Sequence, residues 1–447
     1  MIAYRMSRFT RRLAAVAAVA FGVRVAYVLA LGRDIKFGLD AVWYELVSAT
    51  IASGDGFVDP GRFFGRGVSV PTAFRPPLYP GFLAVVNKTV GHTSLTFQLV
   101  GCVTGAVTVV LLGYLGRRVG GPVVGLCAAC LAAVYPVLIA IDASIMSETI
   151  YVPLVTASVL AVYRALERPT LLHWAVVGAL VGGSVLARGD GILLVPLLIA
   201  PAGLLARGLA PTRRLLLTGT ALLAVALVVG PWVLRNEARL GRPTLATLDV
   251  ATAIAGANCP STYYGPRIGS WEHACTVRPN EDELDELALT DTLQQDGIDY
   301  ALDHELRMPI VAAVRVLRLW GLYDPVGESR RETVESRIFG WQVFAWFVYV
   351  PLALLTVYGF VLLVRRRTQV LPLVAVLVAV TLTGVLVYGK PRFRASAEPV
   401  LLVAASVAIV HVAGVARARG RSGAERRTPA PVTRVSAAGS AHRSPPA

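Results

Sequence analysis

The chain has 447 residues, of which 55% are apolar and 16% charged, and its mean hydropathy is +0.61. These values exceed what a soluble domain of this length carries, so they exclude a water-soluble enzyme and indicate an integral membrane protein. The formal charge of +15 does not predict nucleic-acid binding, because the basic residues lie in short clusters between apolar runs and form no single polar face.

Ten apolar runs are long enough to cross a hydrocarbon core of about 30 Å as helices. In chain order they lie near residues 13–32, 95–115, 121–141, 149–165, 171–187, 191–206, 215–234, 340–362, 370–388 and 396–415. The first run lacks a small-residue cleavage site and is followed by many more runs, so we expect a retained span and not a cleaved signal. The sequence therefore predicts an all-α polytopic membrane protein.

Clusters of arginine between these runs predict the topology through the positive-inside rule. The clusters are Arg5 to Arg12, Arg117 and Arg118, Arg164 and Arg168, Arg207 to Arg214, Arg365 to Arg367, and the tail from Arg417. Placing all of them in the cytoplasm puts both termini there, in a multi-pass protein of the plasma membrane. The apolar stretch "PPLYPGFLAVV" would reverse the side of the next cluster if it crossed, so we expect an interfacial or re-entrant helix there.

This topology divides the chain into four parts and leaves three segments facing outward. The parts are a transmembrane module (1–234) with a catalytic first outward loop (33–76), an extracytoplasmic loop domain (235–339), C-terminal transmembrane helices (340–415) and a disordered basic cytoplasmic tail (416–447). The third outward segment is the short "YGKPRFR". Within the loop domain, "VAAVRVLRLW" predicts an amphipathic helix lying on the membrane.

The five cysteines divide by their predicted environment. Cys102, Cys127 and Cys130 lie inside predicted spans, where cysteine usually serves as a small buried apolar residue. Cys259 and Cys275 both lie in the exported loop, where oxidation is permitted, so a disulfide between them is predicted.

Charged side chains at the outward ends of the spans are the candidate site residues, because charge in or beside a bilayer is energetically expensive. In chain order they are Asp40, Arg75, Asp142, Glu148, Arg188, Asp190, Lys390, Arg392 and Arg394. They come from distant turns but share one side of the membrane. We therefore predict one cavity at the outer lipid interface, with acids to handle a hydroxyl proton and bases to hold a phosphate. For a single residue such as Asp142 or Asp190, a helix cap or an interface marker is the competing interpretation.

Two features of these charges need a local explanation. Positive charge is disfavoured in short outward loops, so the three bases of "KPRFR" indicate either an anionic ligand or pairing with the acidic run "EDELDE" (281–286) of the large loop. Arg24 lies near the middle of the first span, where we expect it to face the bundle and pair with an acid that the sequence does not identify.

Five segments recur in an order that resembles a known family. They are "GLDAVWYELVSATIASGDGF", "FRPPLYPGFLAVV", "YPVLIAIDASIMSETIYVPL", "LARGDGILLVPLL" and "YGKPRFRASAEPVLL". Together they resemble the GT-C integral-membrane glycosyltransferases, in the protein-mannosyltransferase-like branch that includes the lipid A aminoarabinose transferases. The resemblance covers roughly residues 10–235 and 385–415 and rests on the order and common sidedness of the segments.

The resemblance implies transfer of one sugar, such as mannose or arabinose, from a polyprenyl-phosphate donor to an extracytoplasmic hydroxyl, usually with inversion. The acceptor would be a glycan, a lipid or a protein of the cell envelope. In this family an acid of the first outward loop acts at the acceptor, and Asp40 matches it, while Glu148 matches a second acid better than Asp142 does. Many relatives have two adjacent acids where this chain has Leu39 before Asp40, so the resemblance neither requires nor excludes a divalent metal.

The chemistry of such a transfer suggests a role for each candidate. Asp40 would accept the proton of the acceptor hydroxyl as that hydroxyl attacks the anomeric carbon. Arg392 and Arg394, assisted by Lys390 or Arg75, would stabilise the charge that grows on the departing lipid phosphate. Three further residues would bind donor phosphate or sugar, among them a tyrosine one helical turn after Asp40: Tyr44, Arg188 and Asp190.

Two other classes of protein fit the same composition. A transporter or lipid flippase also has many helices with buried charge, but it predicts acids at mid-membrane on broken helices, often in repeated halves. Here the acids cluster at the outward ends of the spans and no internal repeat is visible. A catalytically inert scaffold of cell-envelope assembly would be distinguished by never turning over a donor.

Overall fold

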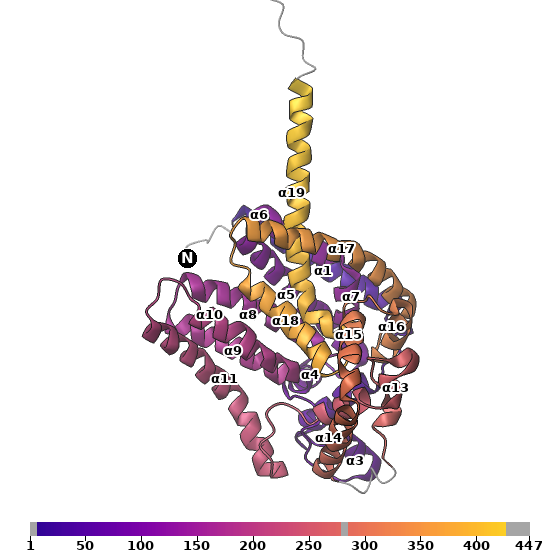
Figure 1. Cartoon of the computed structure of the whole chain (residues 1–447). Coiled ribbons are helices and arrows are strands. Elements are labelled where there is room, and N and C mark those ends of the chain that lie inside the picture. The colour runs from indigo at the N-terminus through magenta and orange to yellow at the C-terminus, as the bar shows by residue number, and fades with distance from the viewer. Residues whose placement is uncertain (1–6, 279–284, 426–447) are drawn as a thin grey trace, which may run out of the picture.

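The computed structural model describes residues 7–278 and 285–425. Within these ranges the chain is built from helices and contains no strand, only an isolated bridge between Val58 and Pro71. Figure 1 shows a bundle of long helices, with the C-terminal helix projecting beyond it at one end. The expected all-α membrane fold is therefore confirmed.

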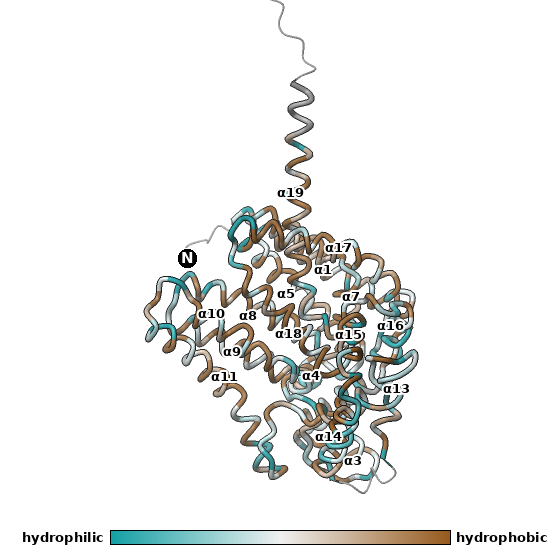
Figure 2. The backbone as a smooth tube through the Cα atoms, viewed as in Figure 1, coloured by the Kyte–Doolittle hydropathy of each residue, from teal (hydrophilic) through white to brown (hydrophobic). Residues whose placement is uncertain are grey.

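Six helices in the described ranges are long and apolar enough to cross a membrane, the last together with the short turn before it. They are α1 (Arg8–Leu31), α5 (Ser94–Gly120), α8 (Glu148–Glu167), α11 (Pro211–Leu240), α17 (Phe339–Arg365) and α19 (Glu398–Glu425). A seventh span results if the bent pair α6 (Pro122–Val134) and α7 (Pro136–Asp142) counts as one. Figure 2 shows these helices as predominantly hydrophobic, with polar residues mainly at their ends and in the loops.

Three shorter apolar segments coincide with the remaining expected spans. They are α9 (Leu171–Ala187), the irregular helix Gly189–Leu204, which includes α10 (Ala200–Leu204), and α18 (Leu371–Leu386). By length and composition, six or seven segments of the described ranges could cross a membrane, so the expected number of ten stays a prediction.

Arg24 binds beside the break between α6 and α7, where its acidic partner also lies. Pro136 lacks a backbone N–H and holds Tyr135 in an extended conformation, which bends the pair by 60°. The buried guanidinium of Arg24 donates to the carbonyls of Ala132 and Ala133 beside this break. Its Nε lies 2.6 Å from Oδ2 of Asp142, so Asp142 serves as the structural partner of Arg24.

The segment expected as the first outward loop (33–76) and the residues just after it fold into three helices, of which the first contacts the other two. These are α2 (Leu39–Ser53), α3 (Pro60–Arg66) and α4 (Leu78–Thr89). The apolar "PPLYPGFLAVV" segment forms most of α4, whose 12 residues are too few to cross a bilayer. Tyr79 of α4 packs edge-on against Tyr44 of α2, with ring centroids 4.9 Å apart. This contact fixes α4 against the helix that carries Asp40.

The segment expected as the extracytoplasmic loop (235–339) forms a helical domain at the end of the bundle opposite the projecting end of α19 (Figure 1). Its helices are α12 (Val250–Ala257), α13 (Pro260–Tyr263), α14 (Glu286–Asp303), α15 (Met308–Leu319) and α16 (Pro325–Arg331). A disulfide joins Cys259 and Cys275, whose Cα atoms lie 6.4 Å apart.

Helix α15 differs from the expected amphipathic surface helix. It packs against α18, and both of its arginines, Arg315 and Arg318, are buried. Arg318 donates to the carbonyl of Ile268 at 2.6 Å and pairs with Glu328, and Arg315 donates to the carbonyl of Ala257 at 2.8 Å. Because buried guanidinium groups need such acceptors, these contacts fix α15 within the loop domain and against the bundle. Contact of α15 with lipid stays a prediction.

The C-terminal tail begins as a continuation of α19. This helix extends to Glu425, so the first ten residues of the segment expected to be disordered are helical. Alanine, arginine and glutamate, which favour helix, make up most of this extension. Residues 426–447 lie outside the described ranges.

Glu286 provides a pH-dependent link between α14 and the first outward loop. Its Oε1 accepts hydrogen bonds from Thr72 Oγ1 at 2.9 Å and from the backbone N–H of Ala73 at 3.2 Å. Burial raises the pKa of Glu286 from 4.5 to about 7, against the effect of these hydrogen bonds. The folded state therefore favours the protonated carboxyl. The stability gained from it is complete below pH 4.5 and is lost as the pH rises through about 7.

We therefore expect Glu286→Gln, which mimics the protonated form, to match the wild type near pH 5 and to exceed its stability above pH 7. The difference should be at most about 3 kcal/mol, from 1.36 kcal/mol per pKa unit. Thermal unfolding of both proteins in detergent from pH 5 to pH 9 measures it. A difference that does not change with pH would contradict this assignment.

Candidate active site

Asp40 lies in the first turn of α2 and is held by two guanidinium groups. Oδ1 lies 2.5 Å from Nη2 of Arg75, and Oδ2 lies 2.9 Å from Nη1 of Arg392. The N-terminal end of a helix favours a negative charge at this position. The side chain is 21% exposed, so the carboxylate can still meet a ligand from the cavity described below.

Arg75 precedes α4 and links two carboxylates. Its Nη1 lies 2.7 Å from Oδ2 of Asp249, which precedes α12 in the loop domain. Its guanidinium also lies 5.1 Å from the centre of the Phe74 ring. Burial disfavours the charged form of Arg75, but Asp249 and Asp40 outweigh it and raise the pKa, so the group stays cationic.

Arg392 lies at the centre of the ionic network. It belongs to the 3₁₀ turn Pro391–Ala397 before α19 and is only 5% exposed. Besides Asp40, its guanidinium pairs with Glu148 and with Glu335, and Glu335 in turn pairs with Lys390. Burial opposes ionisation of Glu335, but the charges of Arg392 and Lys390 lower its pKa below the usual value. Glu335 is thus an anionic bridge between these two bases.

Glu148 lies behind this network. At the start of α8 its side chain is 1% exposed, and its Oε1 accepts hydrogen bonds from Arg392 Nε and, at 2.8 Å, from Arg188 Nη1. Arg188 also donates through Nε to Oδ1 of Asp190 at 3.1 Å. One buried carboxylate oxygen therefore holds two guanidinium groups in place.

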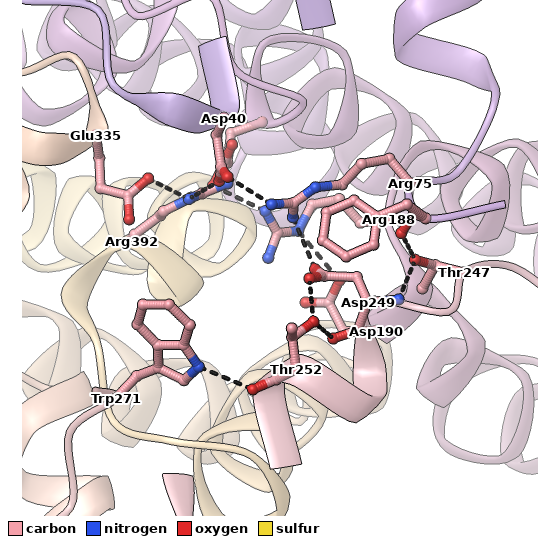
Figure 3. Close-up of polar contacts among 12 residues, drawn as sticks. Asp40, Arg75, Arg188, Asp190, Thr247, Asp249, Thr252, Trp271, Glu335 and Arg392 are labelled. Carbon is pink, nitrogen blue, oxygen red and sulfur yellow. Dashed lines mark hydrogen bonds and ion pairs between the residues drawn. The ribbon is translucent and has the colours of Figure 1, made fainter. Parts of the chain in front are cut away.

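These side chains surround a cavity of about 180 Å³. Figure 3 shows Asp40, Arg75 and Arg392 along one side, with Asp249 and Trp271 of the loop domain facing them. The charged and aromatic residues of its wall are Asp40, Tyr44, Arg75, Arg188, Asp190, Asp249, Trp271, Glu335, Tyr388, Arg392 and Phe393. Transmembrane helix ends and the loop domain thus contribute jointly to one polar chamber.

A second cavity of about 240 Å³ adjoins the first and shares part of its wall. The shared residues are Asp40, Arg75, Asp249 and Trp271. The rest of the second wall carries aromatic and apolar side chains, three threonines, His273 and Glu286, whereas Arg188 and Arg392 line only the first. Asp40 therefore borders both a chamber lined by three arginines and a chamber lined by one.

The structure brings together most of the residues that the sequence nominated, with four exceptions. One of them, Asp142, pairs with Arg24 and does not line the chamber. Lys390 reaches the network through Glu335 and does not line the first cavity. Glu148 contacts the lining arginines but is not part of the wall. Arg394 points away, with Nε 2.6 Å from Oε1 of Glu398 and Nη1 donating to the carbonyl of Leu319.

Three charged or aromatic residues of the chamber wall come from the loop domain (235–339) and escaped the sequence analysis. They are Asp249, Trp271 and Glu335. Two of the three bases of "KPRFR", Lys390 and Arg392, pair with an acid of the large loop, Glu335. Residues 281–284 lie outside the described ranges, and Glu286 bonds Thr72 and Ala73. No spacing or periodicity distinguishes Asp249 or Glu335 from the other acids of the loop.

Gly38 allows the two sides of the site to approach. A Cβ atom at this position would lie 1.6 Å from the carbonyl oxygen of Val334, next to Glu335, and the Gly38 N–H donates to Ser336 Oγ at 3.3 Å.

We expect Gly38→Ala to displace Glu335 from Arg392, lowering activity at least tenfold and the melting temperature by several degrees. Gly65→Ala, where a Cβ meets nothing within 4 Å, is the control. Equal behaviour of the two variants would contradict the close approach.

In the part of the chain that the structure describes, no group of three or more histidine, cysteine, aspartate or glutamate side chains is arranged to hold a metal ion. Asp40, Asp190 and Glu335 are each paired with arginine or lysine.

Comparison with known proteins agrees with this architecture. Residues 74–233 match the family model of dolichyl-phosphate-mannose-protein mannosyltransferases. No curated protein sequence matches the chain. The oligosaccharyltransferase of Archaeoglobus fulgidus in its apo form is 13% identical with a TM-score of 0.56, over 95% of this chain and 53% of that one.

Two further solved structures are similar. The archaeal oligosaccharyltransferase AglB from Archaeoglobus fulgidus, in complex with an inhibitory peptide and a dolichol-phosphate, is 15% identical with a TM-score of 0.54, over 93% of this chain and 52% of that one. ArnT from Cupriavidus metallidurans, bound to undecaprenyl phosphate, is 14% identical with a TM-score of 0.44, over 88% and 76%. The chain spans about half the length of the oligosaccharyltransferases it matches. It has the GT-C fold, and the expected resemblance is confirmed.

Proposed function

We propose that this protein is a membrane glycosyltransferase that moves a single sugar from a polyprenyl-phosphate donor to a hydroxyl acceptor. The observation that carries the proposal is the shared chamber in which the Asp40 carboxylate lies beside the guanidinium groups of Arg75, Arg188 and Arg392. The match to a mannosyltransferase family over residues 74–233 supports it. So does the dolichol-phosphate found in AglB, whose fold this chain shares.

The donor phosphate would bind at Arg392 and Arg188. Both guanidinium groups are fixed by Glu148, so they need little reorganisation when negative charge grows on the leaving phosphate. Hydrogen-bond donors that are already in position stabilise the transition state more than the ground state. Glu148 therefore acts as a positioning residue in this scheme, because it is buried behind the wall and touches the two arginines.

Asp40 would serve as the general base. Each of its oxygens accepts one bond from an arginine and keeps a second lone pair for the acceptor hydroxyl. The hydroxyl proton would pass to Asp40 as the hydroxyl oxygen bonds to the anomeric carbon from the face opposite the phosphate. The bond between that carbon and the phosphate oxygen would break, releasing the polyprenyl phosphate and inverting the anomeric centre.

The two adjoining cavities suggest where donor and acceptor enter. The donor phosphate suits the first cavity, which Arg188 and Arg392 line. The acceptor suits the second cavity, which borders Asp40 but carries neither of those arginines. This arrangement would put the reacting hydroxyl and the leaving phosphate on opposite sides of the transferred sugar, as inversion requires.

The site would face away from the cytoplasm. Glu148 begins α8 and lies at the site, whereas Arg164 lies near the other end of the same helix, within the arginine clusters that the positive-inside rule assigns to the cytoplasm. We infer that both termini are cytoplasmic and that the chamber opens on the extracytoplasmic face of the plasma membrane.

The test is transfer by the purified protein in lipid nanodiscs. Polyprenyl phosphates carrying radiolabelled mannose, arabinose or aminoarabinose are supplied with extracted envelope glycans, lipids and proteins. We expect one donor to lose its label to one acceptor class. Movement of the donor across the bilayer of proteoliposomes without any glycosidic product would instead establish a lipid flippase and overturn the proposal.

A further inference from the structure

A separate cavity of about 640 Å³ lies between α5 and α8, far from the candidate active site. Glu148, at the site, and Arg164, at this cavity, are 16 positions apart on α8. At 1.5 Å per residue they are about 24 Å apart along the helix, close to the thickness of a bilayer core. This cavity therefore belongs to the opposite face of the membrane.

The rim of the cavity, at the C-terminal ends of α5 and α8, is basic. Arg117, Arg118 and Arg164 line it with one carboxylate, that of Glu167, so the formal charge of the rim is positive. Arg118 pairs with Glu167, and Arg164 Nη1 lies 3.7 Å from Glu167 Oε2. Arg117 is exposed, packs over the ring of Phe9 at 4.7 Å, and has no carboxylate within 4 Å in the described ranges. Two charges of the rim thus remain without a matching anion.

The inner wall of the cavity is apolar. Leu111 lies six positions before Arg117 on α5, and Leu160 lies four positions before Arg164 on α8, so apolar side chains line the part nearer the middle of the membrane. Tyr114 and Tyr163 lie between the two zones, where amphipathic aromatic side chains are favoured. Read from the rim inward, the lining changes from cationic to aromatic to aliphatic, an order that complements the phosphate, the glycerol ester region and the acyl chains of a phospholipid.

We propose that this cavity binds an anionic glycerophospholipid, with the phosphate at Arg117, Arg118 and Arg164 and an acyl chain along Leu111 and Leu160. Basic pockets between transmembrane helices on the cytoplasmic side recognise acidic head groups in this way. The site is independent of the proposed sugar transfer, because it uses the other ends of α5 and α8.

The experiment is native mass spectrometry of the full chain titrated with phosphatidylglycerol or with phosphatidylcholine of the same acyl composition. The wild type is expected to bind phosphatidylglycerol at least tenfold more tightly. The variant Arg117→Gln/Arg118→Gln/Arg164→Gln is expected to lose this preference. The control Arg365→Gln/Arg366→Gln/Arg367→Gln, which removes three exposed charges at the end of α17 outside the cavity, is expected to keep it.

A second variant, which changes no charge, tests the cavity independently of any folding defect caused by the triple replacement. Ala161→Phe fills the apolar wall and leaves every arginine in place, so it should also weaken phosphatidylglycerol binding. Equal loss in both triple variants would show general attraction to a basic surface and overturn the site. An unchanged preference in Ala161→Phe, or tighter binding of polyprenyl phosphate than of phosphatidylglycerol through the same arginines, would also overturn it.

Discussion

Replacing Asp40 with asparagine is expected to lower kcat for sugar transfer by about 10²- to 10⁴-fold, the usual contribution of a general base. Donor affinity should stay the same or increase, because the change removes a negative charge between Arg75 and Arg392, the groups that face the phosphate. A role for Asp40 in folding alone would weaken donor binding and turnover together. Turnover and donor Kd, measured separately on the purified variant, distinguish the two roles.

Asp34→Asn is the matched control for this replacement. Asp34 lies in the turn Gly32–Asp34 of the same outward segment, and it is exposed. The Asp34→Asn variant should therefore retain wild-type turnover and donor affinity. If Asp40→Asn also keeps kcat within a few fold of the wild type, Asp40 is not the base.

Replacing Arg392 with glutamine is expected to abolish detectable transfer and to destabilise the protein. The change leaves Asp40, Glu148 and Glu335 without their common partner in a buried setting. Removing one partner of a buried ion pair costs about 3–5 kcal/mol. Adding Glu335→Gln should recover part of that stability, because it removes one uncompensated charge. It should not recover transfer, because the guanidinium that would bind the phosphate is still missing. Thermal unfolding and transfer assays on both variants test this.

Arg394→Gln separates the effect on chemistry from the effect on folding. Arg394 is as buried as Arg392, at 5% exposure, and also pairs with a carboxylate, that of Glu398. It lies outside the chamber, so its loss should lower stability while preserving donor affinity per folded molecule. Loss of donor affinity equal to that of Arg392→Gln would argue that the arginines act only through folding.

The sidedness of the spans is what made the chamber foreseeable from sequence. Asp40 and Arg392 are 352 positions apart in the sequence, but the sequence predicts both at span ends opposite the arginine clusters. In the structure, Oδ2 of Asp40 lies 2.9 Å from Nη1 of Arg392. The cost of charge beside a bilayer makes such residues conspicuous against an apolar background. The same reasoning correctly required an acid for Arg24 but could not identify Asp142, because the pairing depends on the bend at Pro136.

Local geometry and the exported loop set the limit of prediction. Arg392 and Arg394 look equivalent in "KPRFR", but residues two apart in a 3₁₀ turn point about 120° apart, so only one faces the chamber. Glu148 was expected at the reacting groups, and its place behind Arg188 and Arg392 depends on how α8 packs. Asp249 and Glu335 come from a loop without regular apolar periodicity, and nothing in their neighbourhood marks them as site residues.

The central claim is that one chamber holds a lipid phosphate beside the base. The most direct measurement is a structure of the purified protein determined with an added polyprenyl phosphate. We expect the phosphate within hydrogen-bond distance of Arg392 and Arg188, with its chain leading into the membrane and Asp40 facing the same space. A phosphate bound elsewhere, out of reach of both guanidinium groups, would contradict the account.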